Sequence, residues 1–115
     1  MRNSNNNGRC EKQTFSKHTG ICRTYSRIQR AYAQMLEADD NITEFRCNVP
    51  VVDFVLTDGA YTTDFVCTLT SGDVMVRECV ERNLLTRPSK IKMLDASREY
   101  WADRGVTDWG LVIDA

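Results

Sequence analysis

The fold is decided by two apolar stretches and the polar turn between them: Tyr61-Thr62-Thr63-Asp64-Phe65-Val66-Cys67-Thr68-Leu69, then Thr70-Ser71-Gly72-Asp73, then Val74-Met75-Val76-Arg77-Glu78-Cys79-Val80. Both apolar stretches are rich in β-branched and aromatic residues, which favour strands. The segment between them contains serine, glycine and aspartate, which favour turns. We therefore predict that the two stretches pair as a β-hairpin.

The predicted hairpin carries an acidic side chain on each strand, Asp64 on the first and Glu78 on the second. Both residues lie seven positions from Ser71, so a turn centred on Ser71 places them opposite each other. Their Cβ atoms would then lie about 5 Å apart on one face of the sheet. This register requires a loop of odd length, for example three residues with Gly72 in the left-handed conformation. A two-residue loop would place the two acids on opposite faces.

Two like charges that face each other on a sheet destabilise it unless a cation lies between them. Mg²⁺ is typically held by one or two carboxylates together with water and a substrate phosphate. Such an ion activates water for phosphodiester hydrolysis. The alternative is an exposed strand face on which Arg77 or Arg82 pairs with one of the acids.

The flanking sequence predicts two helices and two further extended segments. Residues 26–38 have an apolar helical face that begins with a capping-box pattern, Ser26 followed by Gln29. Residues 42–56 are extended, with a break near Asn48-Val49-Pro50 that marks an edge strand or a kink. A second helix begins at Arg87-Pro88-Ser89 and leads to a buried strand at residues 108–114, parallel to an earlier strand. The predicted fold is α/β, a mixed sheet of about four strands flanked by two helices.

The length of 115 residues predicts a single domain, which we divide into a basic flexible arm at residues 1–22 and an α/β domain at residues 23–115. The hydrophobic fraction of 42% is typical of globular proteins and argues against general disorder. The sequence has no apolar run of about 18 residues and no apolar core of a secretory signal, so we expect a cytoplasmic protein without membrane contact.

Charge is distributed unevenly along the chain. Residues 1–30 hold seven basic residues and one acidic residue, whereas residues 31–115 hold 8 basic and 15 acidic residues. A basic segment on an acidic body indicates contact with a polyanion such as DNA. The candidate nucleic-acid-binding residues are Arg9, Lys12, Lys17, Arg23, Arg27 and Arg30. The alternative is a solvated tail that promotes solubility.

The chain has five cysteines, an odd number that favours reduced thiols in a cytosolic protein. Cys10, His18 and Cys22 form a candidate three-ligand metal cluster that lacks a fourth ligand. The alternative is a polar arm whose thiols have no shared role.

The two hairpin stretches resemble the metal-binding core of the PD-(D/E)XK nucleases, and in particular the N-terminal nuclease domain of TnsA-like transposon endonucleases. The order of the supporting segments adds to the resemblance: Phe15–Gly20, Tyr25–Gln29, Ile42–Pro50, Ala96–Trp101, Gly105 and Asp108–Gly110. The resemblance implies a restriction-endonuclease-like fold and a DNA endonuclease that uses Mg²⁺ or Mn²⁺. It also implies an origin in a phage or another mobile genetic element.

Within this resemblance, Asp64 and Glu78 correspond to the metal ligands, and two positions depart from the family pattern. Gln29 stands where the family has a first-helix glutamate, and Val80 stands where it has the catalytic lysine. Valine neither donates a hydrogen bond nor carries charge, and the loss of such a group typically costs about 10²–10³ in rate. The candidate replacements for the lysine are Lys90, Lys92 and Arg82.

Two functions follow as hypotheses. The first is a TnsA-like metal-dependent DNA endonuclease, impaired or active, with Asp64 and Glu78 as metal ligands and Gln29, Lys90 and Lys92 as further catalytic residues. The second is a catalytically inactive nuclease-fold module that binds DNA or a protein partner in a transposition or defence-related complex. A homodimer with structural contacts alone is a third alternative.

Overall fold

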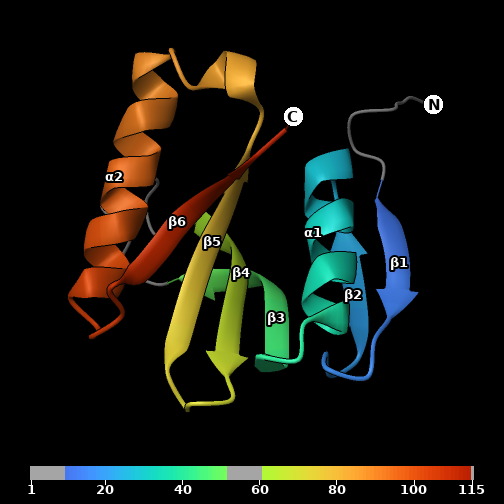
Figure 1. Ribbon diagram of the computed structural model, residues 1–115. Helices are drawn as coiled ribbons and strands as arrows, with labels where there is room; N and C mark the ends of the chain where they lie inside the picture. Colours follow the sequence, from blue (N-terminus) through green and yellow to red (C-terminus); the bar gives the residue numbers. More distant parts are fainter. Residues whose placement is uncertain (1–9, 52–60, 115) are drawn as a thin grey trace.

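The computed structural model describes residues 10–51 and 61–114, which form the α/β fold shown in Figure 1. A four-stranded sheet has the strand order β3-β4-β5-β6, and a separate two-stranded sheet pairs β1 with β2. The elements are β1 (Glu11–Thr14), β2 (Ile21–Thr24), α1 (Arg27–Ala38), β3 (Ile42–Val51), β4 (Tyr61–Leu69), β5 (Val74–Val80), a short 3₁₀ helix (Arg82–Leu84), α2 (Pro88–Ala102) and β6 (Asp108–Ile113). The prediction of a four-stranded mixed sheet with two helices is confirmed at this level.

The central hairpin has the predicted register. Strands β4 and β5 are antiparallel, with Phe65 opposite Arg77 and Thr68 opposite Val74. The turn contains Gly72 at φ +93°, a left-handed conformation that a residue with a side chain adopts only under strain. The loop is therefore of the odd-length kind, and Asp64 and Glu78 lie directly beyond Phe65 and Arg77, the last pair of this ladder.

The two helices cover opposite faces of the sheet, because alternate residues of β4 and β5 pack against different helices. Phe65, Cys67 and Met75 belong to one buried cluster with Ala33 and Leu36 of α1. A second cluster joins the intervening residues of the same strands to α2: Val66 and Val76, with Val49 of β3 and Trp101 of α2. Burial of these side chains on both faces fixes the strand register, since a slip of one residue would exchange the faces.

Strand β6 runs parallel to β5, as predicted, with Val76 opposite Trp109. The expectation that this strand is buried is wrong: three of its six residues are exposed and three are half-buried, with Leu111 37% and Ile113 36% exposed. The reason is its position at the end of the strand order, where only one of its long edges is paired within the described residues. The other sheet edge is β3, which places Pro50 on an edge strand as predicted.

The predicted flexible arm at residues 1–22 is corrected by the structure from Glu11 onward. Strands β1 and β2 pair antiparallel, so the expected boundary at residues 22 and 23 falls inside β2. The polar composition concealed two anchors: Cys22 and Thr24 are buried, and Phe15 lies 5.6 Å from the ring of Phe45. Residues 1–9, which include Arg9, lie outside the described residues, as do residues 52–56 of the predicted extended segment.

Among the helices in the described part of the chain, none is long and apolar enough to cross a membrane.

Candidate carboxylate site

The candidate site lies where the regular alternation of side chains along β3 and β4 is interrupted. On each strand, residues two positions apart there face different helices. Cys47 and Phe65 pack in the cluster that contains α1 residues, whereas Val49 packs in the cluster that contains Trp101 of α2. Thr63 also faces α2, because its Oγ1 accepts a hydrogen bond of 2.9 Å from Nε1 of Trp101. The alternation of side chains is therefore interrupted around Asp64 and around Asn48, which has φ +55°.

Gln29 joins these interrupted strands to the first turn of α1. The helix is capped by Ser26, whose Oγ accepts a hydrogen bond of 3.0 Å from the Gln29 backbone. The amide oxygen of Gln29 accepts a hydrogen bond of 2.8 Å from the backbone of Tyr25. Its Nε2 donates to Oδ1 of Asn48 at 2.9 Å and to Oδ1 of Asp64 at 3.5 Å. Gln29 is 3% exposed, so its amide is fixed and points at Asp64.

Asp64 and Glu78 converge, as the sequence register predicted. The backbone N–H of Asp64 donates to Oε1 of Glu78 at 3.0 Å. The backbone N–H of Cys79 donates to Oδ2 of Asp64 at 2.7 Å. Each carboxylate is thus bound to the strand that carries the other. Arg77 and Arg82, considered as neutralising partners, are directed instead to Asp108 and Asp114.

Glu78 is a buried carboxylate held by hydroxyl groups that the sequence analysis missed. It is 2% exposed, and its Oε2 accepts hydrogen bonds from the Tyr61 hydroxyl at 2.9 Å and from Oγ of Ser97 at 2.6 Å. Ser97 in turn accepts a hydrogen bond of 3.1 Å from Nε1 of Trp109. Ser97 lies three residues after Leu94 and four before Trp101, and this helical spacing is the sequence signal that could have placed it on the buried face.

Leu94 and Ser97 are the buried residues of α2, whereas Ile91 and Arg98 are exposed. The buried face of the helix therefore brings the Ser97 hydroxyl to Glu78.

The two acids are electrostatically strained in the absence of a cation. Burial and then the charge of Glu78 raise the pKa of Asp64 to about 7, while the N–H of Cys79 and the ammonium of Lys90 act in the opposite direction. Burial also raises the pKa of Glu78, and its hydrogen bond from Ser97 opposes that rise. Two carboxylates in one buried site do not ionise independently, which is typical of catalytic and metal-binding pairs.

The donor set fits a hard divalent cation. Within residues 10–51 and 61–114, Asp64 Oδ1 accepts a long hydrogen bond of 3.5 Å from Gln29, and Glu78 Oε1 accepts one of 3.0 Å from the Asp64 backbone. Since each carboxylate oxygen has two acceptor positions, both atoms retain capacity for a further partner. Two carboxylates completed by water and a phosphate are the usual protein contribution to a Mg²⁺ site.

Val80, which the resemblance places at the position of the catalytic lysine, belongs to the core. It is 3% exposed. Lys90, in the first turn of α2, is half-buried, and its charge lowers the pKa of Asp64. Lys92 is exposed, two residues further along the helix. Of the three candidate replacements, Lys90 is the one whose charge lowers the pKa of Asp64, while Arg82 bonds to Asp114.

The candidate nucleic-acid-binding residues divide into two groups. Lys17 and Arg30 have structural partners: the Lys17 ammonium donates to the Asp39 carbonyl at 2.7 Å, and Arg30 pairs with Glu11 at 3.6 Å. Lys12, Arg23 and Arg27 are exposed, and Lys12 lies directly opposite Arg23 in the β1–β2 hairpin. The hairpin therefore presents two adjacent positive charges to solvent.

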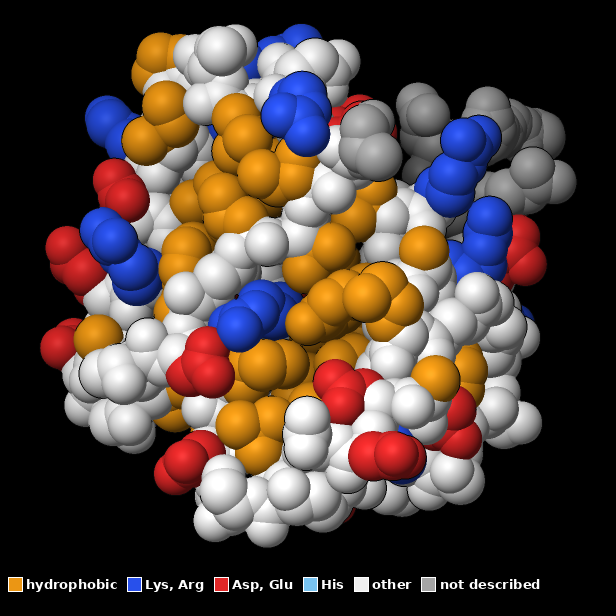
Figure 2. Space-filling model, in the orientation of Figure 1, with side chains coloured by type: hydrophobic (Ala, Val, Ile, Leu, Met, Phe, Trp, Pro, Cys, Tyr) orange, Lys and Arg blue, Asp and Glu red, His pale blue; other side chains and the backbone are white. Residues whose placement is uncertain are grey.

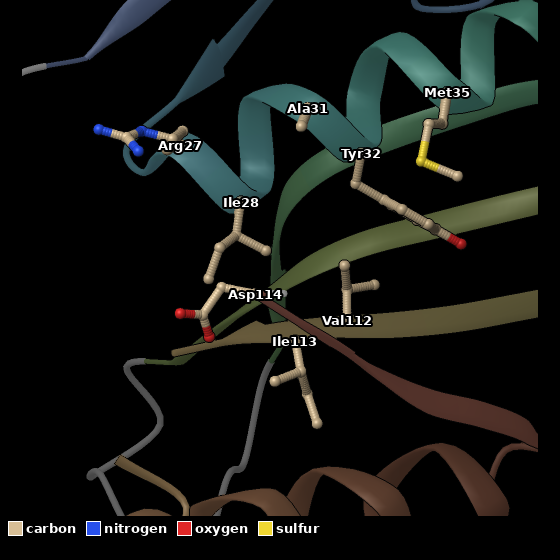
Figure 3. A pocket seen from close by; sticks show the side chains of 8 residues that line it. All are labelled: Arg27, Ile28, Ala31, Tyr32, Met35, Val112, Ile113 and Asp114. Carbon is tan, nitrogen blue, oxygen red and sulfur yellow. The ribbon is translucent and has the colours of Figure 1, made fainter. Parts of the chain in front are cut away.

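Two surface hollows lie near these groups. Figure 2 shows hydrophobic side chains gathered across the middle of the face that carries α1 and β6. A groove of about 270 Å³ there is lined by Arg27, Ile28, Ala31, Tyr32, Met35, Val112, Ile113 and Asp114. In Figure 3 Val112 points toward α1, while Ile113 points away from the helix. A second, more polar hollow of about 220 Å³ is lined by Ile21, Arg23, Tyr25, Cys47 and Asn48.

Comparison with known proteins does not add to these observations, because no family model and no curated protein matches the chain.

Proposed function

We propose that this chain is a metal-dependent phosphodiesterase that acts on DNA, of the TnsA-like kind, with Asp64 and Glu78 as ligands of Mg²⁺ or Mn²⁺. The observation that carries the proposal is the convergence of the two carboxylates, each bonded to the other's strand and each with an oxygen that retains acceptor capacity. The ion, when bound, supplies a Lewis acid and an activated water for hydrolysis.

The residues around the pair support this role. Gln29 donates to the same Asp64 oxygen that we assign to the cation, so it fixes the orientation of that carboxylate. Lys90 brings a positive charge to the site from α2 and is suited to bind the scissile phosphate. Ser97 and Tyr61 hold Glu78 in one rotamer from the opposite side. Each of these side chains is anchored on a helix or strand, as a precise site requires.

The exposed cations of the β1–β2 hairpin support DNA as the substrate. Lys12 and Arg23 form a pair of like charges without an acidic cross-strand neighbour in the described sheet, and Arg27 follows at the start of α1. Such a group contacts phosphates without reading base sequence, so its contribution weakens as salt concentration rises.

A second candidate function is an inactive nuclease-fold module, and one observation favours it. Glu78 is buried under hydrogen bonds from Tyr61, Ser97 and Asp64, and Val80 occupies the position of the usual lysine. In this alternative the carboxylates serve the core, and the groove between α1 and β6 receives a second copy or a partner from a transposition or defence-related complex.

Metal binding and cleavage separate the two candidates. We expect Mn²⁺ to bind the wild-type protein in isothermal titration, and the Asp64→Asn and Glu78→Gln variants to lose that binding. Asp73→Asn removes an exposed turn carboxylate and is the matched control. With supercoiled plasmid and Mn²⁺, the wild type and the control should nick DNA, and Asp64→Asn should not. Binding without nicking would favour the inactive module, and nicking that survives in Asp64→Asn would exclude the site.

A further inference from the structure

A second group of potential ligands lies apart from the carboxylates, where the β1–β2 hairpin meets the central sheet. His18 comes from the turn between β1 and β2, Cys22 from β2, and Cys47 from β3. One ligand atom from each of these residues lies within 4.8 Å of the other two. The three-ligand cluster expected from the sequence is thus corrected in one member, because Cys47 takes the place assigned to Cys10.

The histidine of this cluster is oriented as a ligand by its hydrogen bonds. Its Nε2 accepts from the backbone N–H of Cys47 at 3.4 Å, and its Nδ1 lies 3.4 Å from the carbonyl oxygen of Gly20. These contacts favour the tautomer with a proton on Nδ1 and a lone pair on Nε2, and that lone pair must turn from the Cys47 N–H to the ion when a metal binds. A carbonyl that holds the distal nitrogen of a histidine is the usual outer partner of a metal-binding imidazole.

We propose that His18, Cys22 and Cys47 bind a zinc-class divalent cation and fasten the β1–β2 hairpin to strand β3. Two thiolates and an imidazole are the ligands that Zn²⁺ prefers, and a water molecule completes the tetrahedron. The polar hollow lined by Cys47, Arg23 and Asn48 gives access for that water. This site has no ligand in common with the Asp64–Glu78 pair and does not depend on the proposed nuclease activity.

The distances show how far the cluster is from a zinc geometry. The separation of 3.4 Å between Cys47 Sγ and His18 Nε2 is close to the ~3.5 Å expected between tetrahedral sulfur and nitrogen ligands. The two sulfurs, at 2.8 Å, must separate to about 3.7 Å, the value for two Zn–S bonds at a tetrahedral angle. A small rotation of the half-buried Cys47 side chain provides this movement without moving the buried Cys22.

The chemistry of the cysteine pair suits a metal site. Zinc binds cysteine as the thiolate, so metal binding releases the thiol protons of Cys22 and Cys47.

The position of the cluster explains what the ion would do. Contacts that tie the hairpin to the body include the Lys17 carbonyl, which accepts from the Phe45 N–H at 2.9 Å, and the Ser16 and Lys17 contacts with Glu37 and the end of α1. A cation held by residues from both sides adds a cross-link between segments 25 or more residues apart in sequence. Its main effect is on the stability of the hairpin.

Cobalt substitution tests the proposal on the full-length, reduced protein. We expect Co²⁺ to bind with a stoichiometry of one, giving visible d–d bands of a tetrahedral site and a thiolate-to-cobalt charge-transfer band, both lost when Zn²⁺ is added. Cys22→Ser and Cys47→Ser should each lower the charge-transfer intensity by about half. Each should also weaken cobalt binding by more than ~100-fold, which is the cost of losing a residue that only hydrogen-bonds to a ligand. His18→Gln should weaken binding and shift the d–d bands.

The control is Cys10→Ser, which removes a half-buried free thiol outside the cluster and should leave the spectrum unchanged. Near-ultraviolet circular dichroism verifies that each variant is folded, and native mass spectrometry of the wild type with one equivalent of zinc gives an independent readout. The proposal is overturned if the reduced wild type retains no zinc mass, or if the cobalt spectrum of folded Cys47→Ser matches that of the wild type. Oxidation of Cys22 and Cys47 to a disulfide in place of zinc binding would also overturn it.

Discussion

Replacement of Asp64 by asparagine is expected to stabilise the metal-free protein at pH 8 and to have a much smaller effect at pH 5. The physical reason is that burial and the charge of Glu78 raise the pKa of Asp64 from 3.8 to about 7. Between these two values the folded state binds more protons than the unfolded state, so the stability of the wild type falls as pH rises through this window. The asparagine variant has no such proton to lose, and its side-chain oxygen still accepts the hydrogen bond from Cys79.

The expected magnitude follows from the same two pKa values. Their difference corresponds to roughly 4 kcal/mol at about 1.4 kcal/mol per pKa unit, and this full effect applies above pH 7. Water penetration and side-chain relaxation reduce the penalty of a buried charge, so we expect a gain of about 2 kcal/mol at pH 8. At pH 5 the carboxyl is protonated in the folded wild type, and most of this gain disappears.

Urea unfolding in the presence of EDTA, followed by tryptophan fluorescence at pH 5 and pH 8, measures the effect. Glu81→Gln is the control, because it removes the same charge from an exposed residue close to the site. An Asp64→Asn variant that is less stable than the wild type at pH 8, or that shows the same difference at both pH values, would refute the reasoning. Added Mn²⁺ should stabilise the wild type and not the variant, because a ligand stabilises only the form that binds it.

Three further predictions follow from the site. Ser97→Ala removes a donor from Glu78 and an acceptor from Trp109, so urea unfolding should show a loss of about 1–3 kcal/mol; an unchanged midpoint would contradict this. Lys90→Met should reduce plasmid nicking at least 10-fold, whereas Lys92→Met should not, and equal loss in both would remove the assigned role of Lys90. Lys12→Gln with Arg23→Gln should weaken DNA binding at low salt in fluorescence anisotropy, with little difference left at high salt; a salt-independent deficit would argue against phosphate contact.

The central hairpin was predictable because its determinants are local. Strand propensity, a turn segment and a glycine that takes positive φ all lie within residues 61–80. Once the loop has odd length, Asp64 and Glu78 are expected to lie close together, because each is seven positions from Ser71. The contact of Gln29 with Asp64 could not be predicted in this way, because it depends on how α1 packs beside the hairpin. Sequence patterning indicated only that the helix exists.

Features that depend on contacts between distant segments escaped prediction. The β1–β2 hairpin was taken for a flexible arm because its strands are short and polar, and its burial depends on α1 and β3. The burial of Ser97 is set by a carboxylate 19 residues earlier in the chain. Cys47 joins His18 and Cys22 only because β3 lies beside β2, so no spacing rule within residues 10–22 could have identified it.

The environment of Glu78 bears on the valine at residue 80. A lysine at this position, which is 3% exposed and lies opposite Ile113 of β6, would place a second charge in the core, where its desolvation is costly. Glu78 is satisfied instead by neutral hydroxyl groups, which hold a carboxylate without cancelling its charge. The negative charge therefore remains available to a divalent cation, and Lys90 influences Asp64 from the half-exposed start of α2. Under the proposed function, Val80 therefore contributes packing to the core, and Lys90 supplies the positive charge from the start of α2.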